Sequence, residues 1–248
     1  MRTIRLESTD STMLEARRRL AAGETTPFVI VATEQSGGVG RLGRKWSSPR
    51  GGWWLTIAVA LVDNRRSLRD DTTLQVALWV HTFCCAVFAA VNADHSALRI
   101  KWPNDVMAGD LKLAGILTEV VVHNGRPVAL FGIGVNADVN LEDLDEAVRT
   151  RAMTLRTLIG APVPAELVRY VLETLPTKCA EAVEWPLPPG GAAECVRPLL
   201  WGVGRTVPIT LPGGARVVGR IEGITDDGNL LATINGEQHV IRSVEELG

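Results

Sequence analysis

The sequence has few cysteines, and this shortage excludes two classes of protein. Only four occur in 248 residues, and they form no C-x-x-C pair and no metal-ligand spacing. This argues against a structural zinc site and against a disulfide framework. Because free cysteines are usually buried, and reduced in the cytosol, we expect inert thiols in a cytoplasmic protein. The four residues are Cys84, Cys85, Cys179 and Cys195.

The sequence also lacks a charge excess of either sign. Its formal net charge is −2, with 46% hydrophobic and 22% charged residues. This is an ordinary globular composition, and it argues against a general nucleic-acid binder. A local basic cluster is nevertheless present at Arg41, Arg44, Lys45 and Arg50.

Segments typical of a leader or a membrane span are weak or interrupted. The N-terminal stretch "MRTIRLESTD" has no apolar core, so we expect no signal peptide. The longest apolar run, residues 74–91, contains Gln75, His81 and Thr82. We therefore predict a buried core helix in place of a transmembrane one, with His81 as a hydrogen-bonded core residue.

The order of patterns predicts a mixed α/β domain followed by a small β domain. Residues 185–193, "WPLPPGGAA", are rich in proline and glycine and are typical of a boundary. Short alternating strands separated by turn residues follow it, which is typical of a small barrel. We expect domains at 1–198 and 199–248. Before the boundary we predict strands at 28–34, 53–61, 97–102, 112–121 and 126–136, and helices at 12–22, 74–91, 141–160 and 163–183.

The stretch "EQSGGVGRLGRKW", residues 34–46, raises the question of nucleotide binding. Gly38, Gly40 and Gly43 have the G-x-G-x-x-G spacing of a dinucleotide-binding loop. Such a loop must open a helix, but Pro49 and the glycines after it prevent one. No G-K-[ST] follows either, so a P-loop is excluded. What remains is a loop suited to an anionic small molecule, or a surface loop with solvated charges.

Four segments in the same order resemble the biotin–protein ligases. They are "DSTMLEA", "EQSGGVGRLGRKW", "KWPNDVMAGDLKLAGIL" and "GIGVN", and the third is the most specific. The resemblance implies a mixed, mostly antiparallel sheet with helices on one face, followed by an SH3-like β-barrel. Because no helix-turn-helix precedes residue 1, we expect the monofunctional type without a DNA-binding domain.

The resemblance also implies a two-step reaction. Biotin would attack the α-phosphate of ATP to give biotinyl-5'-adenylate, and a lysine of a biotin-carrier domain of a carboxylase would then take the biotin. Both steps gather negative charge, so positioned cations should carry the catalysis. ATP with Mg²⁺ is the expected nucleotide, and neither nucleic acid nor membrane is an expected partner. The protein could be a monomer or a homodimer.

The resemblance assigns roles around biotin. Ser11, Thr12 and Gln35 would contact the ureido ring, and the backbone at Gly38 and Val39 would border it. Arg41 and Arg44 would bind the carboxylate and the phosphates. Lys112 would be the catalytic cation, contacting both biotin and ATP, because a flexible ammonium can follow the moving charge. Gly115 would line the channel of the biotin tail.

Further roles concern ATP. Asp105 would hold Mg²⁺ or orient the acceptor lysine, and Asn136 would lie near the adenylate. Lys101 would be a second phosphate contact, and Asn104 would support the turn. Lys101 and Asn104 could instead simply cap and solvate that turn, because Pro-Asn-Asp is strong turn chemistry. We expect Trp46 to serve packing.

Departures from the family pattern and two competing functions stay open at this point. Val39 stands where an arginine is usual, Leu42 where another basic residue is common, and Met13 where asparagine is usual. These departures bear on how tightly the ligand is bound, more than on which class of reaction the protein catalyses. The competing functions are a lipoate or octanoate ligase or transferase of the same fold, and a non-catalytic biotin-binding regulator. Retention of Lys112, Asp105 and both arginines argues against the regulator.

Overall fold

The main domain is built on one eight-stranded sheet. The computed structural model describes residues 1–61, 68, 71–184 and 190–248. The strands run in the order β1-β2-β4-β8-β7-β6-β5, and β3 pairs with β2. Only β1 and β2 pair in parallel among these strands, so the sheet is mixed and mostly antiparallel, as expected. The strands are β1 (Arg2–Thr9), β2 (Phe28–Val39), β3 (Lys45–Ser48), β4 (Trp53–Ala60), β5 (Leu98–Lys101), β6 (Asp105–Ala108), β7 (Leu111–His123) and β8 (Arg126–Val135).

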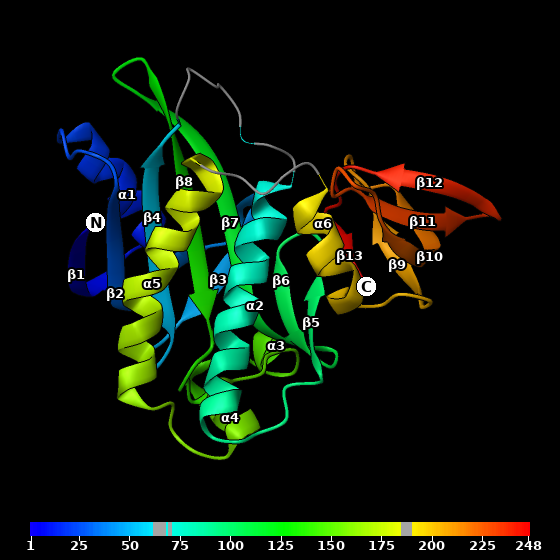
Figure 1. Cartoon of the computed structure of the whole chain (residues 1–248), viewed down its shortest axis with the longest axis horizontal. Coiled ribbons are helices and arrows are strands. Elements are labelled where there is room, and N and C mark those ends of the chain that lie inside the picture. Colours follow the sequence, from blue (N-terminus) through cyan, green and yellow to red (C-terminus); the bar gives the residue numbers. More distant parts are fainter. Residues whose placement is uncertain (62–67, 69–70, 185–189) are drawn as a thin grey trace.

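Helices cover both faces of this sheet unequally. The two long helices, α2 (Thr72–Ala90) and α5 (Ala165–Glu184), lie side by side over one face, in front of the sheet in Figure 1. The short helix α1 (Thr12–Ala21) covers the other face. Alternation along β2 shows this division, because Val29 belongs to the large core and Ile30 to the core under α1. The expectation of helices on one face thus holds for the long pair.

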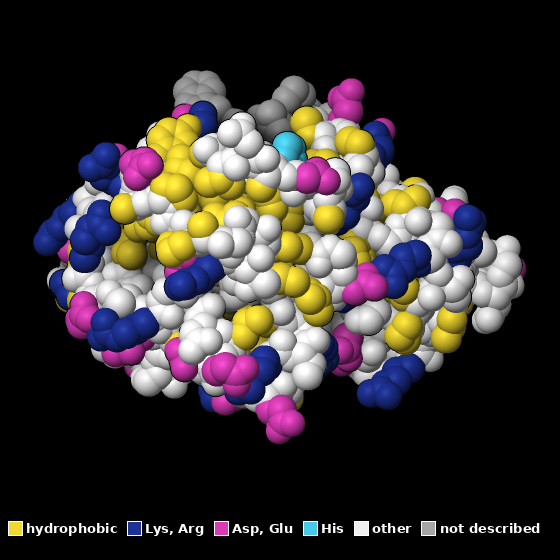
Figure 2. Space-filling model, turned by 90° about the horizontal axis from the view of Figure 1, so that it is seen from below, with side chains coloured by type: hydrophobic (Ala, Val, Ile, Leu, Met, Phe, Trp, Pro, Cys, Tyr) yellow, Lys and Arg dark blue, Asp and Glu magenta, His cyan; other side chains and the backbone are white. Residues whose placement is uncertain are grey.

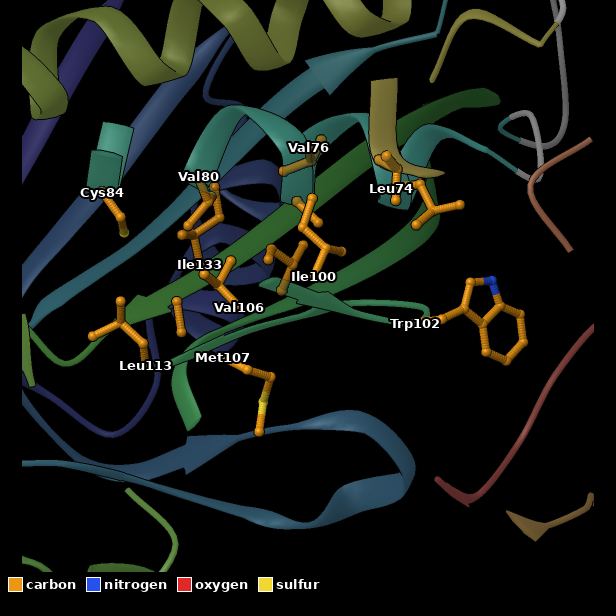
Figure 3. Close-up of a cluster of buried hydrophobic side chains, with 14 of the residues drawn as sticks. Leu74, Val76, Val80, Cys84, Ile100, Trp102, Val106, Met107, Leu113 and Ile133 are labelled. Carbon is orange, nitrogen blue, oxygen red and sulfur yellow. The ribbon is translucent and has the colours of Figure 1, made fainter. Parts of the chain in front are cut away.

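Helix α2 belongs to the interior. By length and apolarity it could cross a membrane, but 61% of its apolar window is buried inside the protein. Its residues Leu74, Val76 and Val80 point into the same apolar cluster as Ile133 of β8 (Figure 3). His81 is buried with Nε2 3.4 Å from the carbonyl oxygen of Leu98, as expected for a core histidine.

The cysteines do not all match the expected buried thiols. Cys84 and Cys179 are fully buried, and burial raises the pKa of both thiols. Cys85 is half-buried and Cys195 is exposed. The expectation was wrong for Cys195, because it lies on the outer side of a short helix whose alanines and Val196 face the core.

The C-terminal part forms a second, smaller sheet. Helix α6 (Gly191–Val196) and the 3₁₀ turn η3 (Arg197–Leu199) lead into it. Of the expected boundary segment, 185–189 lies outside the described residues and 191–193 is helical. The sheet has the order β12-β11-β10-β9-β13 and lies beside β5 and β6 in Figure 1. Its strands are β9 (Thr206–Thr210), β10 (Arg216–Ile224), β11 (Leu230–Ile234), β12 (Glu237–Ile241) and β13 (Glu246–Leu247).

The predicted bounds were wrong for two segments. Residues 141–160 are not one helix but the short pieces η2 (Leu141–Asp143), α3 (Glu146–Arg149) and α4 (Leu155–Ile159). The chain is extended between α3 and α4 because it pairs with β7: Lys112 N donates to Arg151 O, and Met153 N to Lys112 O, both at 2.8 Å. The glycine stretch is also not a simple loop, since β2 runs on to Val39 and pairs back with β3.

Acidic and basic side chains are mixed on the surface. On the face in Figure 2, lysines and arginines alternate with aspartates and glutamates. Within the basic cluster of residues 41–50, Arg50 pairs with Glu7 at 2.6 Å and Lys45 pairs with Asp145 at 2.9 Å. Two of the four cations of this cluster are therefore paired, and the remaining cations are Arg41 and Arg44.

Candidate active site

One cross-strand row of the main sheet forms the floor of the site. Residues in register on neighbouring strands point to the same face. The register runs from Trp54 on β4 to Gly134 on β8. It continues to Gly115 on β7 and then to Asp105 on β6. A Cβ on Gly134 would lie 2.6 Å from Trp46 Nε1, and one on Gly115 would lie 2.9 Å from the same ring. The two glycines therefore make a bare floor under the Trp46 ring.

A β-bulge places the lysine of this site. Lys112 and Gly115 are three residues apart in β7, a spacing that points side chains of a regular strand to opposite faces. The pairing of β6 with β7 shifts here, so that two residues of β6 oppose three of β7. The extra residue, Leu113, turns into the large core. Lys112 is thereby brought to the same cavity as Gly115.

A hydrogen-bonded polar group stands at the N-terminus of α1. The backbone N–H and the hydroxyl of Thr12 donate to Gln35 Oε1 at 2.7 and 3.0 Å. Gln35 Nε2 donates to Ser48 Oγ at 2.7 Å, and Thr56 donates to the Thr12 hydroxyl at 2.9 Å. Ser11 Oγ is buried without a hydrogen-bond partner among the described residues. An unpaired buried hydroxyl is costly, so this atom suits a polar ligand group.

Lys112 and Asp105 form an ion pair at the edge of the floor. The Lys112 Nζ to Asp105 Oδ2 distance is 2.8 Å, and Nζ lies 4.9 Å from the centroid of the Trp46 ring. The lysine side chain is 33% exposed, so a ligand can reach it. Asp105 Oδ1 is buried and has no partner among the residues that the structure describes. One carboxylate oxygen is thus held by the lysine, and the other can accept a cation or a proton.

Arg41 joins the two domains. Its Nη1 donates to Asn104 Oδ1 at 3.1 Å, and its Nη2 donates to the carbonyl oxygen of Val244 at 2.7 Å. Burial lowers the pKa of Arg41, although the nearby Asp105 opposes this effect. Asn104 is buried and donates to the Ile116 carbonyl at 2.8 Å, so it is fixed itself. Both acceptors of Arg41 are neutral, so the guanidinium keeps its positive charge available for a ligand.

Two further predicted residues line the cavity with their polar groups already engaged. Lys101 Nζ donates to Gly248 O at 3.1 Å and lies 4.7 Å from the centroid of the Trp201 ring. Burial lowers its pKa below the ordinary lysine value. Asn136 is buried, and its Nδ2 donates to the carbonyls of Lys112 and Met153 at 3.3 and 3.2 Å. Asn136 therefore ties the 150–154 segment to β7.

Comparison with known proteins decides the family. The Biotin/lipoate A/B protein ligase family matches residues 4–138, more than half of the chain, and the Biotin protein ligase C terminal domain matches residues 202–244. The chain belongs to the biotin/lipoate A/B protein ligase family.

Individual relatives cover most of this family member. The biotin–[acetyl-CoA-carboxylase] ligase of Mycobacterium tuberculosis is 30% identical over 94% of this chain and 84% of its own length. The bifunctional ligase/repressor BirA of Bacillus subtilis is 28% identical over 98% of this chain and 72% of its own. The structure of the Aquifex aeolicus biotin protein ligase with biotin and ATP matches with a TM-score of 0.75 at 24% identity, covering 100% and 98% of the two chains. That likeness concerns the fold.

In this biotin/lipoate protein ligase the predicted residues share one cavity of about 380 Å³, with one exception. Gly38 does not line it. A Cβ on Gly38 would lie 2.7 Å from Ser48 Oγ, so this glycine allows β2 and β3 to approach. Arg44 and Val39 are exposed at the rim. The other predicted residues in the cavity wall are Ser11, Thr12, Gln35, Arg41, Lys101, Asn104, Asp105, Lys112, Gly115 and Asn136.

Sequence reasoning missed part of this ligase's cavity. Trp46 stands in its wall, so the expectation that it serves packing alone was incomplete. Gly132 and Gly134, two apart in β8, face the cavity, and such spacing in a strand is a signal that was present in "GIGVN". No local signal marks the remaining contributors, because they arrive by tertiary folding. Among these are residues 144, 147, 148, 151 and 152 and the segment 244–248.

The acidic residues of the cavity suit a metal ion that arrives together with the nucleotide, not one that the protein holds by itself. Among the described residues no group of three His, Cys, Asp or Glu could hold one. Asp105 offers a single buried carboxylate oxygen. Mg²⁺ at nucleotide sites is commonly held by one or two carboxylates with substrate phosphates, and Asp105 suits that role.

Proposed function

We propose that this protein is an ATP-dependent biotin–protein ligase, which makes biotinyl-5'-adenylate and transfers biotin to a lysine of a biotin-carrier domain. One observation carries the proposal: Lys112, paired with Asp105, stands at the edge of a glycine-floored cavity whose other end is a neutral polar group. The family and its relatives support the same reaction. We propose the cytoplasm as its compartment, and domains at 1–198 and 199–248.

The polar group at α1 favours biotin over lipoate. A cyclic urea has N–H donors and a carbonyl acceptor, which match the Ser11 hydroxyl and the Gln35 amide. A dithiolane ring has neither and would leave the Ser11 hydroxyl unpaired, at a cost of about 1–3 kcal/mol, whereas Gln35 keeps its bonds to Thr12 and Ser48. The apolar wall at Trp46 and the bare glycine floor suit an aliphatic tail.

In the first step a biotin carboxylate oxygen bonds to the α-phosphorus of ATP. The bond from that phosphorus to the bridging oxygen breaks, and pyrophosphate leaves with the electron pair. We assign Lys112 to the carboxylate and the α-phosphate, and Arg41 and Arg44 to the phosphates, because charge builds up at these oxygens. Mg²⁺ bound at Asp105 would neutralise phosphate charge.

In the second step the acceptor lysine amine attacks the acyl carbon, and AMP leaves with the electron pair of the broken bond. The amine must lose a proton, and we assign it to Asp105 Oδ1, a buried carboxylate oxygen that can take the proton when no Mg²⁺ is bound there. We assign adenine to the wall formed by α3 and its surroundings, which includes Leu144, Val148 and Ala152. Asn136 holds the segment that carries this wall.

Ligand-dependent exchange of pyrophosphate with ATP tests the proposal. We expect exchange with biotin and none above background with lipoate or octanoate. Exchange with lipoate alone would make the protein a lipoate ligase of the same fold. Tight biotin binding without any exchange would make it a non-catalytic binder. Mass spectrometry of a biotin-carrier domain after incubation with biotin and ATP checks the transfer step.

A further inference from the structure

A second cavity of about 370 Å³ lies between the two domains. Its walls are the first turn of α2, the turn that follows β5, part of β7 and residues of the C-terminal domain. Arg41 lines both this crevice cavity and the active-site cavity. Trp102 forms one wall: its ring lies at one side of the apolar cluster in Figure 3, and its Nε1 donates to the carbonyl of Gly228 at 2.8 Å.

The charge of the crevice cavity is of one sign. Arg41 and Arg242 line it, and the described lining residues include no carboxylate. Arg242 is exposed and has no hydrogen-bond or ion-pair partner in the described part of the chain. Thr73 and Leu74 place the N-terminal turn of α2, a 19-residue helix, in the wall. The two guanidinium groups favour an anion. The helix end adds no free positive charge, because its N-cap is the buried Asp71, which lies next to Gly228 of the cavity wall.

A buried amide gives independent evidence for a ligand. Asn229 is only 8% exposed and lines the crevice cavity. Its backbone bonds to Thr225, but its side-chain amide has no partner among the described residues. Opposite it the hydroxyls of Thr73 and Thr118 are 3.1 Å apart. The amide N–H of Asn229 is therefore free to donate to a ligand oxygen in this cavity.

We propose that the crevice cavity binds inorganic pyrophosphate, the leaving group of the adenylation step. The inference rests on the proposed function, and it adds an exit site that Arg41 connects to the reacting phosphorus. As the bond to the α-phosphorus breaks, the departing pyrophosphate gains negative charge. Arg41, held in place by Asn104 and Val244, borders both cavities and can contact the departing phosphates from either one, and Arg242, Asn229 and Thr73 receive them.

Calorimetric titration of the full chain with inorganic pyrophosphate tests this site. We expect Arg242→Gln and Asn229→Leu each to weaken pyrophosphate binding about tenfold or more, because each removes a hydrogen bond to a charged oxygen. Arg242→Lys should recover part of the loss. Arg216→Gln is the matched control, since Arg216 is an exposed arginine of the same domain outside the crevice cavity. Biotin affinity should stay unchanged in all four variants.

Kinetics separate pyrophosphate from the phosphates of ATP. We expect Arg242→Gln to raise the inhibition constant of pyrophosphate and to leave the KM for ATP unchanged. A raised KM for ATP with an unchanged inhibition constant would overturn the proposal, as would equal pyrophosphate binding by Arg242→Gln and wild type. An equal loss in Arg216→Gln would also overturn it. If wild type shows no biotin-dependent exchange but binds pyrophosphate through Arg242, the proposed function fails and the anion site stands.

Discussion

Lys112 shows how one side chain depends on its neighbours for its position. The bulge in β7 turns Lys112 toward the cavity, Asp105 holds its ammonium at 2.8 Å, and the Trp46 ring lies beneath it. None of these contacts belongs to the polar group at Ser11 and Gln35, to which we assign the biotin ring. Substitution at Lys112 should therefore affect chemistry and ring binding unequally.

We expect Lys112→Ala to abolish biotin-dependent pyrophosphate exchange and to weaken biotin binding by less than about tenfold, roughly 1.4 kcal/mol. The cation acts where charge develops, whereas the ring contacts stay in place. Exchange kinetics and calorimetry with biotin measure the two effects. Near-normal exchange would show that another cation, such as Arg41, carries the first step.

Lys101 gives a pH prediction at the same scale. Burial lowers its pKa, so its ammonium loses a proton at lower pH than an ordinary lysine. We propose that Lys101 contacts a phosphate of ATP. Because that contact needs the charged form, the exchange rate should fall as pH rises through this lowered pKa. Lys101→Arg should move the alkaline fall to higher pH, since arginine stays protonated. If the normalised pH profiles of wild type and Lys101→Arg coincide, Lys101 is not the titrating group.

At the scale of elements, the sequence predicted the strands and helices that have strong periodicity, but not those shaped by neighbours. Strands β4, β7 and β8 and helices α2 and α5 were predicted because their apolar patterns are long. The strand β6 was missed, since four residues after a turn carry too little pattern. The segment 141–160 was predicted as one helix because its pairing with β7 is a tertiary contact that overrides local propensity.

The residues of the site were likewise predictable where they stand in sequence motifs, and not where tertiary contacts bring them in. Lys112, Asp105 and Gln35 stand in motifs, so the sequence located them. The glycine floor was only partly foreseen, because Gly132 and Gly134 become meaningful once β8 is known to lie beside β7. The contact of Arg41 with Val244 spans two domains, and no local pattern marks it.

The floor gives a prediction for strand β8. A Cβ on Gly134 would lie 2.6 Å from Trp46 Nε1, so Gly134→Ala must push the ring into the cavity. We expect biotin affinity to fall about tenfold or more. Gly37→Ala is the control, because a Cβ there lies 3.4 Å from its nearest neighbour and the residue is exposed. Fluorescence titration with biotin compares the two, and equal affinities would contradict the bare-floor interpretation.

For the whole molecule, Trp201 is one of the residues through which the domains contact each other. It is 7% exposed, and its backbone N–H donates to Ile100 O at 2.9 Å. Its ring lies between two cations, with Lys101 Nζ and Arg205 Cζ each 4.7 Å from the centroid. Its Nε1 donates to Asp110 Oδ1 at 3.1 Å, and Arg205 pairs with the same carboxylate. Apolar burial and polar contacts thus meet at one residue.

We expect Trp201→Ala to lower the free energy of unfolding by about 3–5 kcal/mol, the usual cost of truncating a buried tryptophan. Asp110→Asn should cost less than about 1 kcal/mol, because its ion pair with Arg205 is exposed. Urea titration of wild type and the two variants measures the free energy of unfolding of each and shows which substitution costs more. A larger loss for Asp110→Asn would show that charge, not packing, holds the domains together.

The hydrogen bonds of Arg41 to Asn104 and Val244 also bear on the entropy of ligand binding. A free arginine side chain has about 2 kcal/mol of rotamer entropy to lose when it is ordered. Here folding has already ordered it, from both domains at once. A guanidinium has five N–H donors, so three remain for the incoming phosphates. The ligand therefore meets an arginine that is already preorganised, and the enthalpy of those bonds is not offset by ordering the side chain.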